Sequence, residues 1–477
     1  MKKILVRAGM SPLDSFSADK IIKRNAIGNN VGNLMYAFSV FRNLSTYGVE
    51  LVPDYYRVNP ADAEKINQTY DSYVLPLANA IRPGFIPTLR KYTDLIEKLT
   101  IPVIVIGMGM AFPYEPNVEQ ERPFDNDVRK FVSAVLENSN ILGLRGQITS
   151  DYLSYLGFKE GRDHMVIGCP SMYTFGNNIN IRDLDLNSNS FISINMTPKA
   201  DQKALKFLNG LSRKYKNLEF IPQDLDEMIL TYSGAPFLGN AINSTINNYP
   251  NSLNSDLYKN NQVKFFLSAP SWIKHMKNVN LSVGTRLHGN VAPILAGTPS
   301  MVIPIDGRMR ELAEFHNFPR VSVDEMYEGM ELEELLNMVD IHSVEKNQKK
   351  NYENFINFLN KNNLESVYLY DKKGLKTRFD EKIEQIDLKP PITPITSCNS
   401  NEMRGRLQNS FDIMVKKHEK IKNNNDKKFK IKDDAISQLR SQLNKKEKLN
   451  ERLSHKISSM ENSKSWRLTK PLRELRH

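Results

Sequence analysis

The segment SVGTRLHG, residues 282–289, places a guanidinium and an imidazole two positions apart at the end of an apolar stretch. Arginine binds carboxylates and phosphates through paired hydrogen bonds, and histidine can donate a proton near neutral pH. Gly289 permits close backbone approach, and the helix predicted to start there offers N–H groups to an anion. We interpret Arg286, Leu287, His288 and Gly289 as a binding site for an anionic small molecule. The alternative is structural: Arg286 pairs with a nearby carboxylate, and His288 is satisfied at the helix start.

Two further arginines follow predicted strands. In AGTPSMVIPIDGRMRE a strand ends shortly before Arg308, and in ILGLRGQITSDYL a short strand ends at Arg145. Ligands of parallel α/β sheets bind beyond the carboxyl ends of the strands. Arginines at equivalent ends of two facing sheets would therefore converge on one cleft.

Two glycine-containing segments could also contact a ligand. IGNNVGNLM, residues 27–35, precedes a helix and could hold an anion or a sugar through Asn30 and Asn33. IGMGMAFP, residues 106–113, follows a predicted strand. Neither segment completes a dinucleotide-binding or P-loop motif, so each alone is more often a tight turn than a site. No Asp or His cluster has metal-ligand spacing, and we expect neither a metal nor a cofactor.

These residues must be positioned by short apolar runs that alternate with helix-like segments, a pattern that predicts βαβ units and mostly parallel sheets. The first set of predicted strands is Lys3–Arg7, Val49–Pro53, Ser72–Leu77, Pro102–Ile106, Ile141–Leu144 and Met165–Ile167. The second set is Phe191–Asn195, Leu218–Ile221, Val263–Leu267, Val279–Val283, Ser300–Ile303 and Arg320–Val323. Residues 176–190, which are polar and rich in Asn and Asp, separate the two sets and are typical of a linker.

We therefore predict an α/β fold with two Rossmann-like domains, residues 1–175 and 191–345, that face each other across a cleft. A helical return segment (346–384), a second linker (385–430) and a basic helical tail (431–477) are expected to follow. The tail has an a/d spacing that Lys446 and Asn450 interrupt, formed by Ile436, Leu439, Leu443, Leu453, Ile457 and Met460. This pattern predicts either a coiled coil or a single solvated helix.

The composition is that of a soluble globular protein, with 40% hydrophobic and 25% charged residues among 477. The two cysteines, Cys169 and Cys398, form no disulfide or metal pattern, which fits a reducing cytoplasm. The longest apolar run is too short to span a bilayer, and the first residues lack the core of a secretory signal. We expect a cytoplasmic protein.

The positive charge is confined to the C-terminal residues. The chain has 65 Lys and Arg against 54 Asp and Glu, and residues 401–477 hold 21 and 10 of them, which leaves 44 of each sign in residues 1–400. A neutral body argues against nucleic-acid binding. The basic tail, with Trp466 near its end, could contact anionic lipid at the inner face of the membrane or could self-associate.

Four segments together resemble the polysaccharide pyruvyl transferase family over roughly residues 25–325: GNNVGNLMYAFSVFRNL, VIVIGMGMAFP, ILGLRGQITSDYLSYLGF and SVGTRLHGNVAPILAGTPSMVIPIDGRMREL. The resemblance implies a GT-B-like fold and transfer of pyruvate from phosphoenolpyruvate to a pair of sugar hydroxyls, with a glycan as acceptor. It also implies that Arg145 and Arg286 bind the donor and that His288 is the general acid. The chain departs from the family at Asn33, where an acidic residue is common, and at Arg308, where a lysine is common.

Two other functions are compatible with the sequence. A GT-B-type nucleotide-sugar glycosyltransferase would have the same two domains, although no ribose-binding acidic motif is evident. A non-catalytic scaffold in glycan synthesis is the second alternative, against which Arg145, Arg286 and His288 in one chain argue. The last residues, NSKSWRLTKPLREL, are similar to a tail of some bacterial surface-polysaccharide glycosyltransferases, which favours a role in exopolysaccharide biosynthesis for the cell envelope.

Overall fold

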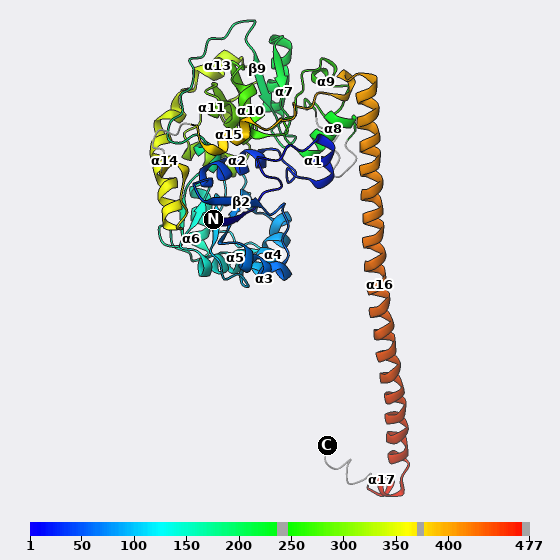
Figure 1. The fold of residues 1–477 in the computed structure, drawn as a ribbon. Helices are drawn as coiled ribbons and strands as arrows, with labels where there is room; N and C mark the ends of the chain where they lie inside the picture. The colour runs from blue at the N-terminus through cyan, green and yellow to red at the C-terminus, as the bar shows by residue number, and fades with distance from the viewer. Residues whose placement is uncertain (236–246, 370–375, 470–477) are drawn as a thin grey trace. The chain divides into compact units, whose positions relative to one another are not determined.

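The computed structural model describes residues 1–235, 247–369 and 376–469, and the chain divides into two compact units, residues 1–410 and 411–477 (Figure 1). Every site residue predicted from the sequence belongs to the first unit. That unit contains two parallel four-stranded sheets, each with its own hydrophobic core. We call the parts built around them the first half and the second half.

The first half is built on strands in the order β2-β1-β3-β5, all of them parallel. These strands are rich in Val, Ile and Leu because helices cover both faces of the sheet. A single bridge between Met108 and Leu144 connects the end of β5 to the parallel pair β7 and β8. The elements are β1 (Lys2–Val6), α1 (Ala18–Arg24), α2 (Gly32–Leu44), β2 (Val49–Pro53), α3 (Ala63–Thr69), β3 (Ser72–Pro76), β4 (Asn79–Ile81), α4 (Ile86–Ile96), β5 (Val103–Ile106), β6 (Gly109–Met110), α5 (Asp125–Asn138), β7 (Leu142–Leu144), α6 (Gln147–Tyr155) and β8 (His164–Val166).

The second half repeats this architecture, with strands in the order β10-β9-β11-β12 and again all parallel. Strand β11 lies in the middle of the sheet and leads directly into helix α11, which carries the Arg-x-His motif. The elements are β9 (Ile192–Asn195), α7 (Gln202–Lys214), β10 (Leu218–Phe220), α8 (Leu225–Ser233), α9 (Asp256–Lys259), α10 (Ala269–Met276), β11 (Leu281–Gly284), α11 (Leu287–Leu295), β12 (Ser300–Val302), α12 (Gly307–Phe315) and α13 (Leu332–Asn337).

The predicted fold class, with two Rossmann-like sheets in a GT-B-like protein, is confirmed. Two predicted strands are wrong. Only isolated β-bridges form along these two segments. Val263–Leu267 makes two, from Val263 to Phe220 and from Phe265 to Ile392, and Arg320–Val323 makes one, from Arg320 to Val302. Val263, Phe265, Phe266, Leu267 and Val321 are buried in the core, but no ladder continues along either segment.

The chain crosses between the halves at residues 176–190 and again after α13. Residues 176–190 contain no helix or strand, but Ile179 and Ile181 are buried, so this segment packs more closely than its polar composition suggested. After α13, helix α14 (Ser343–Lys361) returns to the first half, where Asn354 donates to the Val166 carbonyl and Asn362, just beyond the helix, to the Ile141 carbonyl. Helix α15 (Arg378–Glu384) follows, and the predicted return segment also includes residues 370–375, which lie outside the described residues.

The second unit is mostly one long helix, α16 (Ser400–Glu461), followed by the short α17 (Lys464–Leu468). The helix starts at Ser400 rather than near Ile431, so the expectation of a linker through residue 430 is wrong for its last thirty or so residues. The end of the predicted tail, residues 470–477, lies outside the described residues. In the described part of the chain, no helix combines the length and the apolarity needed to cross a membrane.

Candidate active site

The motif residues lie at the turn from β11 into α11, as the sequence predicted. Arg286 is the N-cap residue of α11, with an extended backbone, and its N–H donates to the Asn195 side chain at the end of β9 (2.8 Å). Gly289 packs against the same asparagine, since a Cβ added there would lie 2.4 Å from Asn195 Cγ. Leu287 is buried. Gly289 and Leu287 therefore fix the start of the helix in the second half.

The Arg286 side chain is already engaged within the protein. Its Nη1 and Nη2 atoms donate to the two Asp224 carboxylate oxygens (2.9 and 2.5 Å), its Nε donates to the Met196 carbonyl (2.8 Å), and Glu227 lies 3.6 Å away. Although Asp224 is largely desolvated, Arg286 and a hydrogen bond from Asn30 hold its pKa below the usual value. The guanidinium is thus bound bidentately by a carboxylate, as the structural alternative predicted.

The Gly-Asn segment of the first half, residues 27–35, contacts the Arg286–Asp224 ion pair. Asn30 donates through Nδ2 to Asp224 (2.8 Å) and accepts the Gly32 N–H through Oδ1 (2.8 Å). Asn33 instead donates to the Ile27 and Gly28 carbonyls and closes its own loop. Asn30 and Asn33 thus shape a loop that joins the halves, and the structure gives both amides protein partners.

His288 faces the first half from the first turn of α11. Its Nε2 lies 3.8 Å from the Cys169 thiol, and its ring meets that of Tyr36 edge-on, with 6.5 Å between the centroids. A Cβ on Gly32 would lie 2.4 Å from His288 Nδ1, so only glycine fits against the imidazole there. Burial, reinforced by the charges of Arg145 and Arg308, lowers the pKa of His288 to about 3. The imidazole is therefore neutral at pH 7 in the unliganded protein, which corrects the premise of a near-neutral pKa.

Arg145, which follows β7, is 2% exposed, and its charge acts on the same histidine. Its guanidinium lies 5.4 Å from the centre of the Tyr36 ring. Its Nε and Nη2 atoms are buried and have no hydrogen-bond partner among the described residues. A Cβ on Gly109 would lie 2.9 Å from Arg145 Cδ, so the second glycine of the Gly-Met-Gly segment makes room for this side chain. A buried cation without an acceptor is costly unless an anion completes it.

Three further ionisable side chains belong to the same site: Arg308, Arg82 and Glu311. Arg308 lies in the first turn of α12, 27% exposed, and makes a loose contact of 3.2 Å with Asp306. Arg82 follows strand β4 and is exposed, and partial desolvation together with the charges of Arg308 and Arg7 lowers its pKa. Glu311 accepts hydrogen bonds from the Thr149 N–H and hydroxyl at the start of α6, and burial raises the pKa of Glu311 to about 7. Three arginines and two carboxyl groups, Asp306 and Glu311, thus lie here, and the raised pKa of Glu311 leaves the site cationic.

The first turn of α12 also fastens the halves beside the site. The Gly307 N–H donates to the Phe112 and Pro113 carbonyls of the first half (3.2 and 3.1 Å). Glu311 binds Thr149 across the same boundary. Together with the contact of Asn30 with Asp224, these bonds hold His288 and Arg308 of the second half against Arg145 of the first.

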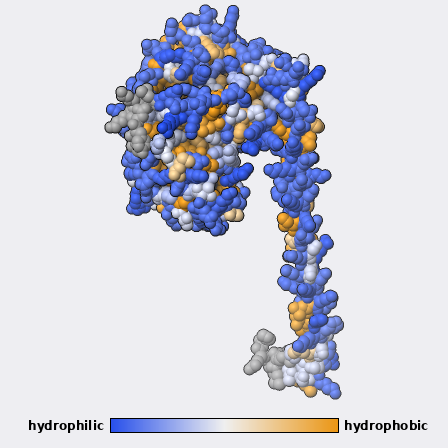
Figure 2. Space-filling view, in the orientation of Figure 1, coloured by the Kyte–Doolittle hydropathy of each residue, from blue (hydrophilic) through white to orange (hydrophobic). Residues whose placement is uncertain are grey.

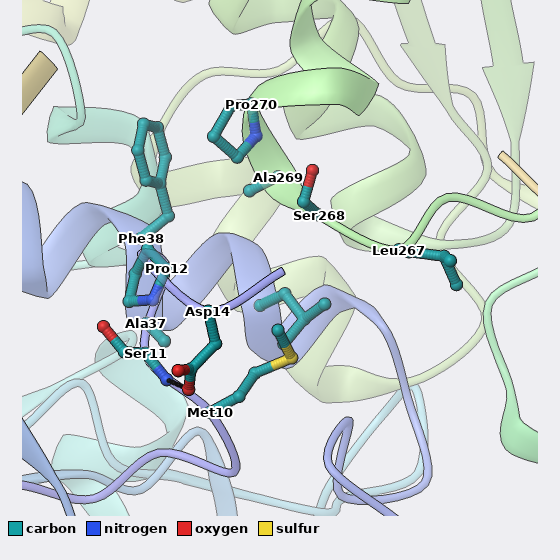
Figure 3. Close-up of a pocket in the computed structure, with 11 residues that line it drawn as sticks. Met10, Ser11, Pro12, Asp14, Ala37, Phe38, Leu267, Ser268, Ala269 and Pro270 are labelled. Carbon is teal, nitrogen blue, oxygen red and sulfur yellow. Dashed lines mark hydrogen bonds between the residues drawn. The ribbon is translucent and has the colours of Figure 1, made fainter. Parts of the chain in front are cut away.

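A small pocket lies elsewhere, beside α2, where Met10–Asp14 face the start of α10 at Leu267–Pro270 (Figure 3). Its volume of about 10 Å³ is enough for roughly one water molecule. It shares no residue with the cationic cluster and is lined mostly by apolar side chains. Within the described ranges, no three His, Cys, Asp or Glu residues are grouped so as to hold a metal ion.

Sequence reasoning missed Tyr36, Cys169, Arg82, Asp224 and Glu311. Arg82 had a usable signal, because it follows a short strand just as Arg145 does. Tyr36 lies four residues after Gly32, one turn along the same helix, and so on the face that Gly32 presents to the motif histidine. The contacts of Cys169, Asp224 and Glu311 with the site join residues 62 to 162 positions apart and carry no local pattern.

Two Rossmann-like halves that meet at a buried cationic site define a GT-B-like α/β enzyme. The sequence model of the polysaccharide pyruvyl transferases matches residues 30–307, and the chain belongs to this family. It is therefore a transferase, and the family supports pyruvate transfer in polysaccharide metabolism. No curated protein sequence matches the chain.

Similar solved structures are distant in sequence. The UDP-GlcNAc 2-epimerase from Methanocaldococcus jannaschii is 12% identical over 76% of this chain and 99% of its own, with a TM-score of 0.37. The UDP-GlcNAc 2-epimerase from Neisseria meningitidis is 12% identical over 80% and 98%, with a TM-score of 0.35. A functionally uncharacterised protein from Klebsiella pneumoniae is 13% identical over 68% and 92%, with a TM-score of 0.34. At such identities and scores, no property of these proteins is carried over to this chain.

Proposed function

We propose that the protein transfers pyruvate from phosphoenolpyruvate to two hydroxyls of a glycan acceptor and forms a pyruvate ketal. The observation that carries this proposal is the buried Arg145 guanidinium near His288, whose Nε and Nη2 have no hydrogen-bond partner within the described ranges. Phosphoenolpyruvate presents a carboxylate and a phosphate close together, which suits two guanidiniums. Arg145 and Arg308 are the donor ligands in this proposal, with Arg82 next to Arg308.

His288 is the proposed general acid. It transfers a proton to the methylene carbon of the donor, which becomes the methyl group of the ketal, while one sugar oxygen bonds to the central carbon. The second sugar oxygen then bonds to the same carbon, and the bond from that carbon to the phosphate oxygen breaks. One hydroxyl proton returns to His288, and the other leaves with the phosphate. Arg145 and Arg308 stabilise the leaving phosphate.

Binding of the donor allows His288 to take up the proton that this step needs. In the unliganded protein burial and two cations hold the pKa of His288 at about 3. A donor with several negative charges offsets Arg145 and Arg308, and the pKa of the imidazole then rises. The acid is therefore charged only when the donor is present, which limits protonation of the site without substrate.

Arg286 takes a different role from the one that the family resemblance implied. Its donors bind Asp224 and the Met196 carbonyl, so we assign it to hold the Asn30 loop and the start of α11 in place. It is a positioning residue in this proposal and does not touch the donor.

The test is incubation with phosphoenolpyruvate and candidate glycans, in which phosphate release and the mass gain of the glycan are measured together. Equal amounts of phosphate and pyruvylated product support the proposal. Phosphate release without a mass gain, or transfer of a sugar from a nucleotide donor, contradicts it.

A further inference from the structure

Helix α16 carries a continuous heptad repeat from residue 429 to 460. Ten successive positions follow the alternating three-and-four spacing of a coiled-coil seam, starting with Phe429 at an a position. Three of the ten are polar: Lys432, Lys446 and Asn450. The other seven are apolar and each 48–64% exposed: Phe429, Ile436, Leu439, Leu443, Leu453, Ile457 and Met460.

This apolar stripe needs a partner. Helices in proteins are stabilised chiefly by packing of one face, and an isolated helix gains little from its own hydrogen bonds. Figure 2 shows apolar patches along the helix between long hydrophilic stretches. The stripe is narrow, with the 3.5-residue period of a coiled coil rather than the broad apolar face of a helix that lies on lipid.

We propose that residues 429–460 of α16 pair with the same residues of a second copy of the chain, in parallel and in register, as a two-stranded coiled coil. The occupant is another copy because the seam is complementary to itself. Ile436 and Ile457 stand at a positions and Leu439 and Leu453 at d positions, the combination that favours two parallel strands.

Asn450 determines the orientation. In the parallel arrangement this a-position amide faces its counterpart on the second copy, and the two side chains satisfy each other. In the antiparallel arrangement that overlaps the whole repeat, it faces Leu439 and is buried without a partner. A single asparagine in the seam therefore selects the parallel pair at some loss of affinity.

The flanking charges agree with this register. In a parallel pair each g residue faces the following e residue of the other strand, so Lys428 meets Asp433 and Lys456 meets Glu461. The intervening pairs are Ala435 with Arg440, Gln442 with Glu447 and Leu449 with Ser454. None of the five pairs joins like charges.

Two lysines weaken the seam. Lys432 and Lys446 occupy d positions, where their stems can lie along the interface while the ammonium groups reach water. Each still faces a like charge, so the pair is reversible and becomes tighter as salt screens the repulsion. Lys446→Leu should tighten the dimer at least tenfold.

The first experiment measures the oligomeric state of the full chain by sedimentation equilibrium between 1 and 100 µM. We expect a monomer–dimer equilibrium. The double variant Leu439→Glu with Leu453→Glu should be monomeric over the whole concentration range. The melting transition of its first unit, residues 1–410, should be unchanged. The matched control, Ser441→Glu with His455→Glu, places the same charges on the outer face and should still dimerise. A full chain that is monomeric at 100 µM, or a seam variant that still dimerises, overturns the proposal.

The second experiment tests the orientation by disulfide formation, in a Cys398→Ser background where the remaining Cys169 is fully buried. Met460→Cys lies at a d position and should form a disulfide dimer under mild oxidation. Ser458→Cys lies on the outer face and should not. In an antiparallel pair the two residue-460 thiols would stand about 45 Å apart, at 1.5 Å per residue, and could not react. Anionic vesicles that bind a monomeric chain would show that lipid covers the stripe and would also overturn the proposal.

Discussion

The guanidinium of Arg145 lies 5.4 Å from the centre of the Tyr36 ring, and two of its buried nitrogen atoms have no acceptor in the part of the chain that the structure describes. Arg286, the other arginine expected at the donor site, is saturated by Asp224 and the Met196 carbonyl. The two arginines therefore differ in what they contribute to the unliganded fold. This difference yields predictions that separate a ligand-binding residue from a positioning residue.

Arg145→Gln should leave the melting temperature of the unliganded protein unchanged or raise it, because two buried nitrogens of Arg145 have no hydrogen-bond partner among the described residues, and their desolvation offsets the contacts with Tyr36 and Glu311. The same variant should weaken phosphoenolpyruvate binding about a hundredfold or more, since a buried charged pair with the donor is lost. Differential scanning fluorimetry with and without the donor measures both effects. A variant that melts lower but keeps the donor-induced shift would assign Arg145 to the fold instead.

Arg286→Gln should lower the free energy of unfolding by about 1–2 kcal/mol, because Asp224 loses its charged partner but stays 35% exposed and keeps its hydrogen bond from Asn30. Asp224→Asn should cost a similar amount, and the double variant should cost clearly less than the sum, with a coupling of about 1–2 kcal/mol. Chemical denaturation of the four proteins measures this cycle. Additive losses would show that the pair is not coupled, and loss of donor affinity in all variants that remain folded would return Arg286 to the donor site.

His288→Gln should reduce turnover by roughly two to four orders of magnitude, the usual size of a general-acid contribution, with little change in donor affinity. Donor binding to the wild type should take up close to one proton near pH 7, because the imidazole changes from neutral to charged. Calorimetric titrations in buffers of different ionisation enthalpy measure this uptake. The His288→Gln variant should show none, and equal uptake in both proteins would contradict the assignment.

The stability of the unliganded protein should depend on pH through the same residue. The folded pKa of about 3 lies below the unfolded value of 6.5, so the unfolded chain binds more protons between these values. The contribution of neutral His288 is present above pH 6.5 and is lost as the pH falls towards 3. His288→Gln should therefore flatten the fall in stability between pH 6.5 and 4, as denaturant unfolding at several pH values can show.

Gly32→Ala should disturb catalysis from the first half. Its Cβ would lie 2.4 Å from His288 Nδ1, so the imidazole or the Asn30 loop must move. We expect turnover to fall at least tenfold while donor affinity changes less, because Arg145 is untouched. Gly84→Ala is the control, since a Cβ there would meet no other atom within 4 Å. Steady-state kinetics on both variants decide this, and equal activity would show that the loop adapts freely.

Local patterns were sufficient for the residues that follow strands. Arg145, His288 and Arg308 were placed at strand ends because an apolar run, a charged residue and a helix start follow each other in sequence, and the structure brings the three near one another. The role of Arg286 was not accessible in this way, because its partner Asp224 lies 62 positions earlier and on another helix. Likewise, apolar composition alone could not distinguish Val263–Leu267 from a strand, since a buried run and a ladder strand have the same residues.

Polar composition was equally ambiguous for residues 400–430. These residues were predicted to belong to the linker 385–430, yet they form the first half of α16. A helix exposed on most of its surface needs no apolar majority, and the many lysines of this segment are good helix formers. The order of residues 429–460 did predict the heptad register of the later part of α16, which composition alone does not reveal.

The return of the chain through α14 constrains how such enzymes can be recombined. Asn362, just beyond this helix, accepts the N–H groups of Asn140 and Ile141, and Phe358 packs against Gly143 so closely that a Cβ there would lie 3.0 Å from its ring. A chimaera that exchanges only residues 1–175 would pair a foreign β7 with the wrong covering helix. An exchange of the first half between relatives therefore has to include α14 as well. The exchanged sequence then consists of two separate stretches of one gene, residues 1–175 and the α14 segment.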